Sequence, residues 1–192
     1  QELMHTVNIL IIKLTAVGDV VLSTAAFGAI RQEFPNAQIT CLTSPAASAI
    51  VQSCPHLNGI IVVDPKFKNF QALWRISQEL RRHHFDKVVD LQNNRVSHLL
   101  AFLTMAKETY GYNNGKLAFL LSRKIKNDIR NISPVEHQFR ILKMLGIDYD
   151  PDIRLKLWPR AIDEVYVQSL LDSEWLSGGH VFVGLNVSAS RQ

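Results

Sequence analysis

Residues 7–40 read VNILIIKLTAVGDVVLSTAAFGAIRQEFPNAQIT, and they set the architecture expected for the whole chain. The run begins with Val7–Lys13, a short apolar segment rich in β-branched residues, which is typical of a strand buried on both faces. A loop over Leu14–Gly18 follows, and over Asp19–Phe34 the apolar residues recur with the spacing of a helix. A second strand is expected at Gln38–Leu42, so this stretch predicts a βαβ unit.

The rest of the chain continues the alternation of short strands and amphipathic helices. Further strands are expected at Gly59–Asp64, Lys87–Leu91 and, shorter, Glu108–Tyr112. Further helices are expected at Pro45–Cys54, Asn69–Arg82, Asn94–Met105, Pro134–Gly146 and Pro159–Leu176. Residues 113–132 are predicted to hold a short helix with loops. The alternation predicts an α/β fold, with a Rossmann-like, mostly parallel sheet and helices on both of its faces.

Composition excludes several classes of protein. With 192 residues, 47% of them hydrophobic, the chain is expected to bury a core and not to be disordered. No apolar run approaches the ~20 residues that span a bilayer, and no stretch resembles a signal peptide. The two cysteines, Cys41 and Cys54, form neither a disulfide scaffold nor a metal-type cluster. We therefore expect a reducing, cytoplasmic setting.

Positive charge is concentrated in the middle of the chain. Residues 66–143 hold 15 of the 21 lysines and arginines but only 6 of the 17 acidic residues. This segment is either a solvated surface or a face that meets an anionic partner, because clustered positive charge attracts anions. Nucleic acid is not the expected partner, since the basic residues are scattered and the sequence holds no nucleic-acid-binding motif.

The end of the chain predicts the beginning of a second domain. After the helix expected at 159–176, Ser177-Gly178-Gly179 interrupts the pattern, and Val181–Leu185 reads as a buried type of strand. One such strand cannot cover its own two faces. We expect residues 1–158 to form one domain, 159–180 to form a linking helix and connection, and 181–192 to begin a further domain of a longer protein.

The loop after the first strand is one place for a functional site, since open parallel sheets bind ligands beyond the carboxyl ends of their strands. Lys13–Asp19 contains neither the GxGxxG fingerprint nor a phosphate loop, which disfavours ordinary dinucleotide and ATP binding. It does place Gly18 before Asp19 at the start of a helix. Asp19 is either an N-cap or a carboxylate that acts as a general base.

Two further segments carry candidate polar residues. Asp90–Arg95 follows the strand expected at 87–91, and there Asp90 can bond to neighbouring backbone amides. Gln92 and Arg95 could contact a hydroxyl-rich or anionic ligand. His137 and Arg140 are spaced to share one face of a helix, where either a ligand or the solvent could be their partner.

Four stretches resemble the bacterial ADP-heptose:lipopolysaccharide heptosyltransferases of glycosyltransferase family 9. They are Ile9–Thr40, Phe85–Ala101, Val135–Ile147 and Val183–Gln192. The family opens with a strand, a basic residue, a small Ser/Thr-containing loop and then Gly-Asp, which match the residues up to Gly18-Asp19. Two departures stand out. Arg140 follows His137 by three residues instead of four, and Val187-Ser188 replaces the Pro-Gly that is common in the family.

The resemblance implies half of a GT-B enzyme, with the acceptor mainly on the N-terminal domain and the nucleotide-sugar donor mainly on the C-terminal one. Members invert the sugar, need no metal or other cofactor in the active site, and use the Asp of the Gly-Asp loop as the base, which is Asp19 here. Substrate contacts are expected from Lys13, Thr15, Gly18, Gln92, Arg95, His137 and Arg140. Residues that bind the ADP-sugar would lie beyond Gln192, so the chain alone should neither transfer sugar nor bind the donor.

The function implied is transfer of a heptose or a related sugar from an ADP-sugar to a lipopolysaccharide core or another lipid-linked glycan. The basic segment suits an acceptor that bears phosphates and carboxylates. Arg81, Arg82 and Lys87 could bring the protein to the inner leaflet of the membrane. Two alternatives remain: a Rossmann-like domain that binds a ligand without catalysis, or a nucleotide-dependent oxidoreductase or epimerase, whose glycine fingerprint the sequence lacks.

Overall fold

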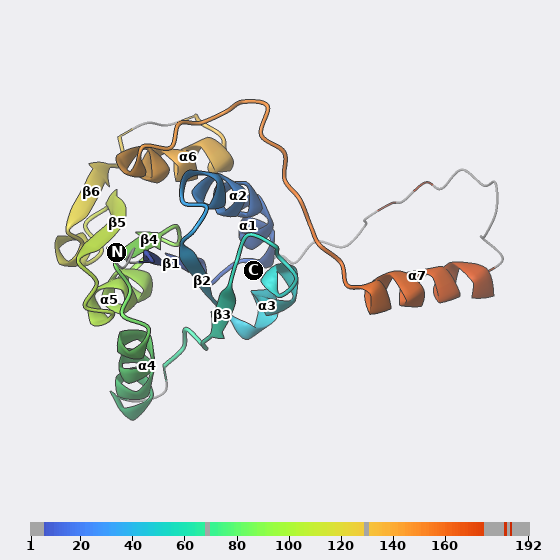
Figure 1. Cartoon of the computed structure of the whole chain (residues 1–192), viewed down its shortest axis with the longest axis horizontal. Coiled ribbons are helices and arrows are strands. Elements are labelled where there is room, and N and C mark those ends of the chain that lie inside the picture. Colours follow the sequence, from blue (N-terminus) through green and yellow to red (C-terminus); the bar gives the residue numbers. More distant parts are fainter. Residues whose placement is uncertain (1–5, 68–69, 129–130, 175–182, 184, 186–192) are drawn as a thin grey trace, which may run out of the picture. The chain divides into compact units, whose positions relative to one another are not determined.

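The computed structural model describes residues 6–67, 70–128, 131–174, 183 and 185. Contacts divide the chain into two units, 1–158 and 159–192. The first unit holds a sheet of six parallel strands in the order β3-β2-β1-β4-β5-β6 (Figure 1). The strands are β1 (Asn8–Ile12), β2 (Gln38–Thr43), β3 (Gly59–Val62), β4 (Lys87–Asp90), β5 (Glu108–Asn113) and β6 (Arg123–Lys126). The predicted α/β class and parallel sheet are confirmed.

Strand β1 lies at the centre of the sheet and is buried on both faces, as its continuous apolar sequence predicts. Ile9 and Ile11 point into one hydrophobic core, while Leu10 and Ile12 point into another, and all four are fully buried. Because β1 pairs with both β2 and β4, its backbone is also bonded on both sides.

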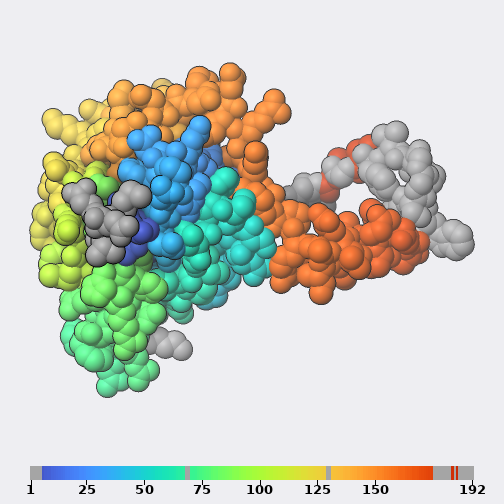
Figure 2. Space-filling model, in the orientation of Figure 1, coloured from blue at the N-terminus to red at the C-terminus, as the bar shows by residue number. Residues whose placement is uncertain are grey.

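Helices cover both faces of the sheet. The core that contains Ile9 and Ile11 also includes residues of α1 (Val17–Leu22), α2 (Thr24–Glu33), α3 (Pro45–Val51) and α6 (Pro134–Leu142). On the other face, α4 (Phe70–Arg82) and α5 (Arg95–Leu103) contact each other and contribute Leu80 and Leu100 to the second core. The space-filling view shows α6 and the residues after it, in orange, beside α2, in blue (Figure 2), and these two helices are in contact.

One predicted helix is in fact two. The segment expected as a single helix over 19–34 is divided at Ser23 into α1 and α2. Ser23 Oγ donates a hydrogen bond to Asp19 O (2.9 Å), and Thr24 Oγ1 donates one to Val21 O (2.8 Å). Hydroxyl groups that bond back to carbonyls of the preceding turn bend helices, which explains the division. The helix also begins two residues early, at Val17, so that Asp19 lies within its first turn.

The segment 113–132 holds a short 3₁₀ helix, η1 (Ala118–Leu120), as predicted, and also an unpredicted strand, β6. The sequence of β6 is RKIK, and three of its four residues are exposed. It lies at the edge of the sheet, where lysine and arginine are common because they discourage pairing with another chain. Since β6 lacks the apolar alternation of a half-buried strand, its sequence does not indicate a strand.

Cap residues determine where α5 and α6 begin. Asn94 Oδ1 accepts a hydrogen bond from Ser97 N (2.9 Å), and Ser133 Oγ accepts one from Glu136 N (3.0 Å). After α6, the short 3₁₀ helix η2 (Lys143–Leu145) ends at Gly146, whose φ of 87° is the left-handed conformation that glycine tolerates. The predicted beginning and end of this helical segment are confirmed.

The second unit contains helix α7 (Ala161–Ser173), at the position where a helix is predicted. Arg160 and Asp163 form its first turn, with the Arg160 backbone amide donating to Asp163 Oδ2 (2.9 Å). The strand expected at 181–185 falls almost entirely outside the described residues. Among the helices that the structure describes, none combines the length and the apolarity that crossing a membrane requires.

Gly111 of β5 is a site where a single methyl group should destabilise the fold. A Cβ there would lie 2.8 Å from Leu121 Cδ1 and 3.1 Å from Asn93 Oδ1, and Asn93 Oδ1 already accepts a hydrogen bond from Tyr112 N (2.7 Å). We expect Gly111→Ala to lower the free energy of unfolding by about 1–3 kcal/mol, measured by urea denaturation. Gly18→Ala is the matched control and should not destabilise, because among the described residues no atom beyond its chain neighbours and its own helix backbone lies within 4 Å of its Cβ position. Equal stability of the two variants would contradict this packing.

Candidate functional site

The candidate site lies at the carboxyl edge of the sheet, between β1 and β4. Strands β1 and β4 are neighbours at the centre of the sheet; β2 and β3 follow outward on the side of β1, and β5 and β6 follow outward on the side of β4. The chain therefore turns to opposite sides after β1 and after β4. Ligands of such sheets bind in the crevice at this reversal. The loop after β1 carries Lys13 and Thr15, the first turn of α1 carries Gly18 and Asp19, and the loop after β4 carries Gln92.

Gln92 joins the two loops. Its Oε1 accepts hydrogen bonds from Leu14 N and Thr15 N, both at 3.0 Å, and its Nε2 donates to Thr15 Oγ1 (3.3 Å). One side chain thereby satisfies two backbone amides that the end of β1 leaves without a sheet partner. The amide group of Gln92 thus holds the loop in place, and its contact with substrate stays a prediction.

Lys13 and Asp19 form an ion pair in which the lysine is buried and the aspartate is exposed. Lys13 Nζ lies 3.7 Å from Asp19 Oδ2 and donates a hydrogen bond to Leu91 O (3.3 Å). The Lys13 side chain is 8% exposed, whereas that of Asp19 is 55% exposed. Burial lowers the pKa of Lys13 below the usual value for lysine, and this effect is opposed by the negative charges of Asp19 and Asp90.

Asp19 is not the N-cap of its helix, which is Ala16, but it bonds back to the amide of that N-cap residue. The carboxylate occupies the third position of α1, where its Oδ2 accepts a long hydrogen bond, 3.4 Å, from Ala16 N. Beyond this bond and the ion pair with Lys13, the described residues give the Asp19 side chain no partner. An exposed, ionisable oxygen next to a fixed cation can accept a proton from a bound hydroxyl group.

Asp90, the last residue of β4, is fully buried and anchors the turn that follows. Its Oδ1 accepts hydrogen bonds from Gln92 N and Asn93 N, each at 2.9 Å, as the sequence suggested. Its Oδ2 lies 2.6 Å from Nδ1 of His98, which is also fully buried. Sequence reasoning missed His98, although its position one helical turn after the Asn94 cap places it near this turn.

His137 and Arg140 are brought together on the ring of Tyr112, a residue that the sequence did not single out. The rings of Tyr112 and His137 stack with centroids 4.1 Å apart, and Tyr112 Oη donates to His137 O (2.7 Å). Arg140 lies over the same ring and donates to Asp128 Oδ1 (3.0 Å). Burial lowers the pKa of His137, and the charges of Arg140 and Lys13 lower it further. Lys13 therefore links this cluster electrostatically to the candidate site.

Gly18 and Arg95, which were also expected to contact substrate, make no side-chain contact of this kind within the described part of the chain. Gly18 is the second residue of α1 and has open space at its Cβ position. Arg95 is the exposed first residue of α5 and, within the described part of the chain, makes no side-chain hydrogen bond or ion pair. The structure leaves the guanidinium of Arg95 available at the carboxyl end of the sheet.

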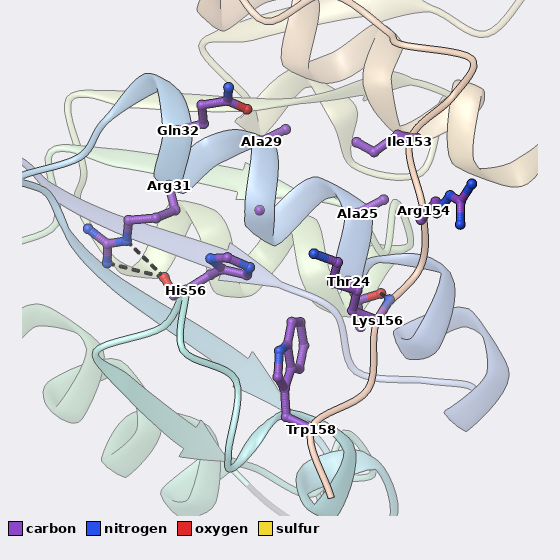
Figure 3. A pocket seen from close by; sticks show the side chains of 11 residues that line it. Thr24, Ala25, Ala29, Arg31, Gln32, His56, Ile153, Arg154, Lys156 and Trp158 are labelled. Atoms are coloured by element: carbon purple, nitrogen blue, oxygen red, sulfur yellow. Dashed lines mark hydrogen bonds between the residues drawn. The ribbon is translucent and has the colours of Figure 1, made fainter.

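A separate hollow of about 510 Å³ lies between α2 and the segment 153–158, and none of the predicted site residues lines it (Figure 3). Trp158 meets the ring of His56 edge to face, with centroids 5.4 Å apart. Lys156 N donates to Thr24 Oγ1 (3.2 Å), which fixes the segment against α2. Burial and the charges of Lys156 and Arg31 lower the pKa of His56. The volume is within the range of small-molecule pockets, so this hollow is a second candidate.

The described residues hold their possible metal ligands apart and bury both thiols. There, no group of three or more His, Cys, Asp and Glu side chains is arranged to hold a metal ion. Both cysteines are buried free thiols, and burial raises the pKa of Cys41 to about 12, so that its thiol stays protonated.

Comparisons with solved structures show which proteins share this fold. The chain superimposes with a TM-score of 0.79 and 21% identity on a glycosyl transferase of family 9 from Veillonella parvula, covering 88% of this chain and 50% of that one. It superimposes with a TM-score of 0.63 on E. coli ADP-heptose lps heptosyltransferase II, at 18% identity, covering 88% and 51%. The same score is found for E. coli heptosyltransferase WaaC with ADP-2-deoxy-2-fluoro heptose, at 17% identity, covering 78% and 51%.

These likenesses establish the fold, and they confirm at that level the resemblance noted in the sequence. The chain spans about half the length of the structures that it matches. No protein-family model matches the sequence, and no curated protein matches it significantly.

The bonds of Gln92 predict a local effect of its removal. In Gln92→Ala, Leu14 N and Thr15 N lose their shared acceptor, so their amide hydrogen exchange should become roughly tenfold faster. The free energy of unfolding should fall by only about 1–2 kcal/mol. Gln52→Ala removes an exposed glutamine without a side-chain bond and should change neither quantity. Unchanged exchange of Leu14 and Thr15 in Gln92→Ala would refute the bridge.

The ion pair predicts how the pKa of Lys13 responds to Asp19. In Asp19→Asn the pKa of Lys13 should fall further, because the charge that opposes the effect of burial is lost. Titration of the ¹⁵N-labelled lysine side chain by NMR measures this. The exposed Asp148 supplies the control, since Asp148→Asn should leave the pKa of Lys13 unchanged. A rise of the pKa of Lys13 in Asp19→Asn would show that the two groups do not interact as described.

Proposed function

We propose that this chain is the acceptor-binding half of an inverting glycosyltransferase, with Asp19 as its general base. The observation that carries the proposal is the exposed Asp19 carboxylate, held 3.7 Å from the buried ammonium of Lys13 at the carboxyl edge of the sheet. It is supported by a fold shared with one glycosyl transferase of family 9 and two heptosyltransferases. The reaction and its substrates belong to the proposal, since those proteins are about twice as long.

In this reaction the acceptor hydroxyl group binds beside Asp19 and gives its proton to the carboxylate. The hydroxyl oxygen forms a bond to the anomeric carbon of the donor sugar, while the bond from that carbon to the leaving phosphate breaks on the opposite face. The electron pair of the broken bond stays with the nucleoside diphosphate. Lys13 holds Asp19 in position and is itself fixed by Leu91 O, so that the base is oriented before substrate arrives.

The donor we propose is an ADP-sugar, a heptose or a related sugar. Support comes from the E. coli heptosyltransferase whose structure contains ADP-2-deoxy-2-fluoro heptose. Residues outside this chain would bind that donor. No metal enters the proposed mechanism, because the departing diphosphate can be stabilised by cationic side chains or helix N-termini of the second domain.

The acceptor we propose is a lipopolysaccharide core or a similar glycan with acidic groups. Arg95 provides positive charge at the carboxyl end of the sheet, which suits phosphates and carboxylates on the acceptor. The Tyr112 cluster adds hydrogen-bonding groups there, with Arg140 paired to Asp128 and the pKa of His137 lowered. Association with the membrane stays a prediction, and of the three basic residues expected to face lipid, two are paired with carboxylates while Arg81 keeps its charge. Arg81 donates to Leu103 O, Arg82 pairs with Glu79, and Lys87 is bonded to Glu108.

A second candidate function is the binding of a ligand without catalysis. The hollow between α2 and residues 153–158 favours it, because this hollow is of ligand size and lies outside the proposed catalytic edge. Charged residues that line it, Arg31, Arg154 and Lys156, are all cationic, so an anion is the expected ligand. Saturable binding that survives the loss of Asp19 and ceases on replacement of Lys156 would favour this function.

Asp19→Asn in the full-length protein tests the proposed role of the base. Asparagine can still accept the hydrogen bond from Ala16 N, so the free energy of unfolding should stay within about 1 kcal/mol of the wild-type value. Turnover, measured as release of nucleoside diphosphate with a lipopolysaccharide acceptor, should fall by roughly 10²–10⁴-fold. The KM for the acceptor should change much less, because the lost interaction acts mainly in the transition state.

The matched control is Asp148→Asn, which removes a carboxylate that is 82% exposed and lies far along the chain from Asp19. This variant should keep its turnover. An Asp19→Asn enzyme with near-normal turnover would show that another group is the base.

A further inference from the structure

We propose that His98 is a positioning residue: a fully buried imidazolium that holds the loops around Asp19 through Asp90 and Asn114. His98 lies on α5, beneath the turn that follows β4, and both His98 and Asp90 have no solvent exposure. The protonation state follows from the hydrogen bonds alone. Only the effect on catalysis rests on the function proposed above.

The orientation of the Asn114 amide determines whether Nε2 of His98 must carry a proton. Asn114 Nδ2 donates to Asn93 O (2.7 Å), and Asn114 Oδ1 accepts from Lys116 N (3.1 Å). Turning the amide over would bring two donors together at one end and two acceptors together at the other. His98 Nε2, at 3.2 Å from Asn114 Oδ1, therefore faces an acceptor and must carry a proton.

At Nδ1, the partner of His98 is the carboxyl group of Asp90, 2.6 Å away. A proton must lie between the two atoms, because two lone pairs at that distance would repel each other. Asp90 Oδ1 accepts hydrogen bonds from two backbone amides, which favours the carboxylate. The proton therefore belongs to His98, which makes it an imidazolium paired with a carboxylate.

The pair carries no net charge, which reconciles it with complete burial. A lone buried charge is very costly, whereas a pair with all its lone pairs and protons hydrogen-bonded is tolerated. Here Asp90 receives three donors and His98 finds an acceptor at each nitrogen. The loss of either partner leaves the other charge without compensation.

Three loops depend on this pair. Asp90 holds the backbone of Gln92 and Asn93, and Gln92 in turn holds Leu14 N and Thr15 N in the loop that leads to Asp19. Through Asn114, His98 also holds the segment after β5, which is tied to Asn93 O. His98 thus acts on the candidate base only through other residues, by fixing the loop that precedes it.

Histidine-selective ¹⁵N NMR of the full chain at pH 7 tests the protonation state directly. We expect one of the seven histidines, assigned by the loss of its signals in His98→Gln, to carry protons on both nitrogens. His137, whose pKa is lowered by its surroundings, should be neutral in the same spectrum and is the internal reference. An unprotonated nitrogen on His98 at this pH would overturn the proposal, whatever the protein catalyses.

Asp90→Asn tests the pairing without removing the acceptor of the two backbone amides. The asparagine Oδ1 can still bond to Gln92 N and Asn93 N, but His98 should lose a proton and become neutral, with the proton on Nε2. Exchange of the Leu14 and Thr15 amides should become faster, by at most the roughly tenfold expected for Gln92→Ala, because Gln92 remains as their acceptor but its loop is held less firmly. In the full-length enzyme, kcat should fall while the KM for the acceptor changes little. If His98 stays doubly protonated in Asp90→Asn, Asp90 is not its charge partner and the proposal fails.

Discussion

Strand β1 is bonded on both sides and covered on both faces, and this confinement determines where the polar residues after it can lie. The chain can leave β1 only by turning out at the carboxyl edge, where Lys13 N still bonds to Leu42 O but the amides of Leu14 and Thr15 no longer have a sheet partner. Gln92 of the neighbouring strand's loop provides the acceptor that these two amides need. The geometry of the Lys13–Asp19 pair follows from this arrangement, because the loop that Gln92 fixes connects Lys13 to the first turn of α1, where Asp19 lies.

Most of the fold could be predicted because strands β1 to β4 are short apolar runs, and because helices α5 and α6 begin at side-chain caps. Ser133, Pro134 and Gly146 define the ends of the α6 segment through interactions that are local in sequence. Strand β6 could not be predicted, since it is an edge strand with a basic, exposed sequence. The division of the first helix at Ser23 depends on hydroxyl-to-carbonyl bonds, which compete with a helical pattern that the sequence otherwise supports.

Which residues gather at the candidate site could be predicted from the sequence, but their roles there could not. Lys13, Asp19 and Gln92 follow strands at one edge, and that topology alone brings them together. Their roles depended on contacts across 77 and 78 positions of sequence, which place the amide of Gln92 on Leu14 and Thr15 instead of in the open crevice. His98 and Tyr112 could not be predicted as part of the site, because the sequence around a single histidine or tyrosine does not indicate which residue it contacts. The hollow against α2 depends on the path of residues 153–158, which form no regular element.

In the proposed reaction an acceptor hydroxyl group binds beside Asp19, at the reversal of strand order. A crystal structure of the full-length protein with an acceptor glycan bound would locate that hydroxyl group. We expect a hydroxyl oxygen within about 3.2 Å of the Asp19 carboxylate, the distance at which a base can take its proton. An acceptor bound in the hollow between α2 and residues 153–158, with no hydroxyl group near Asp19, would contradict it.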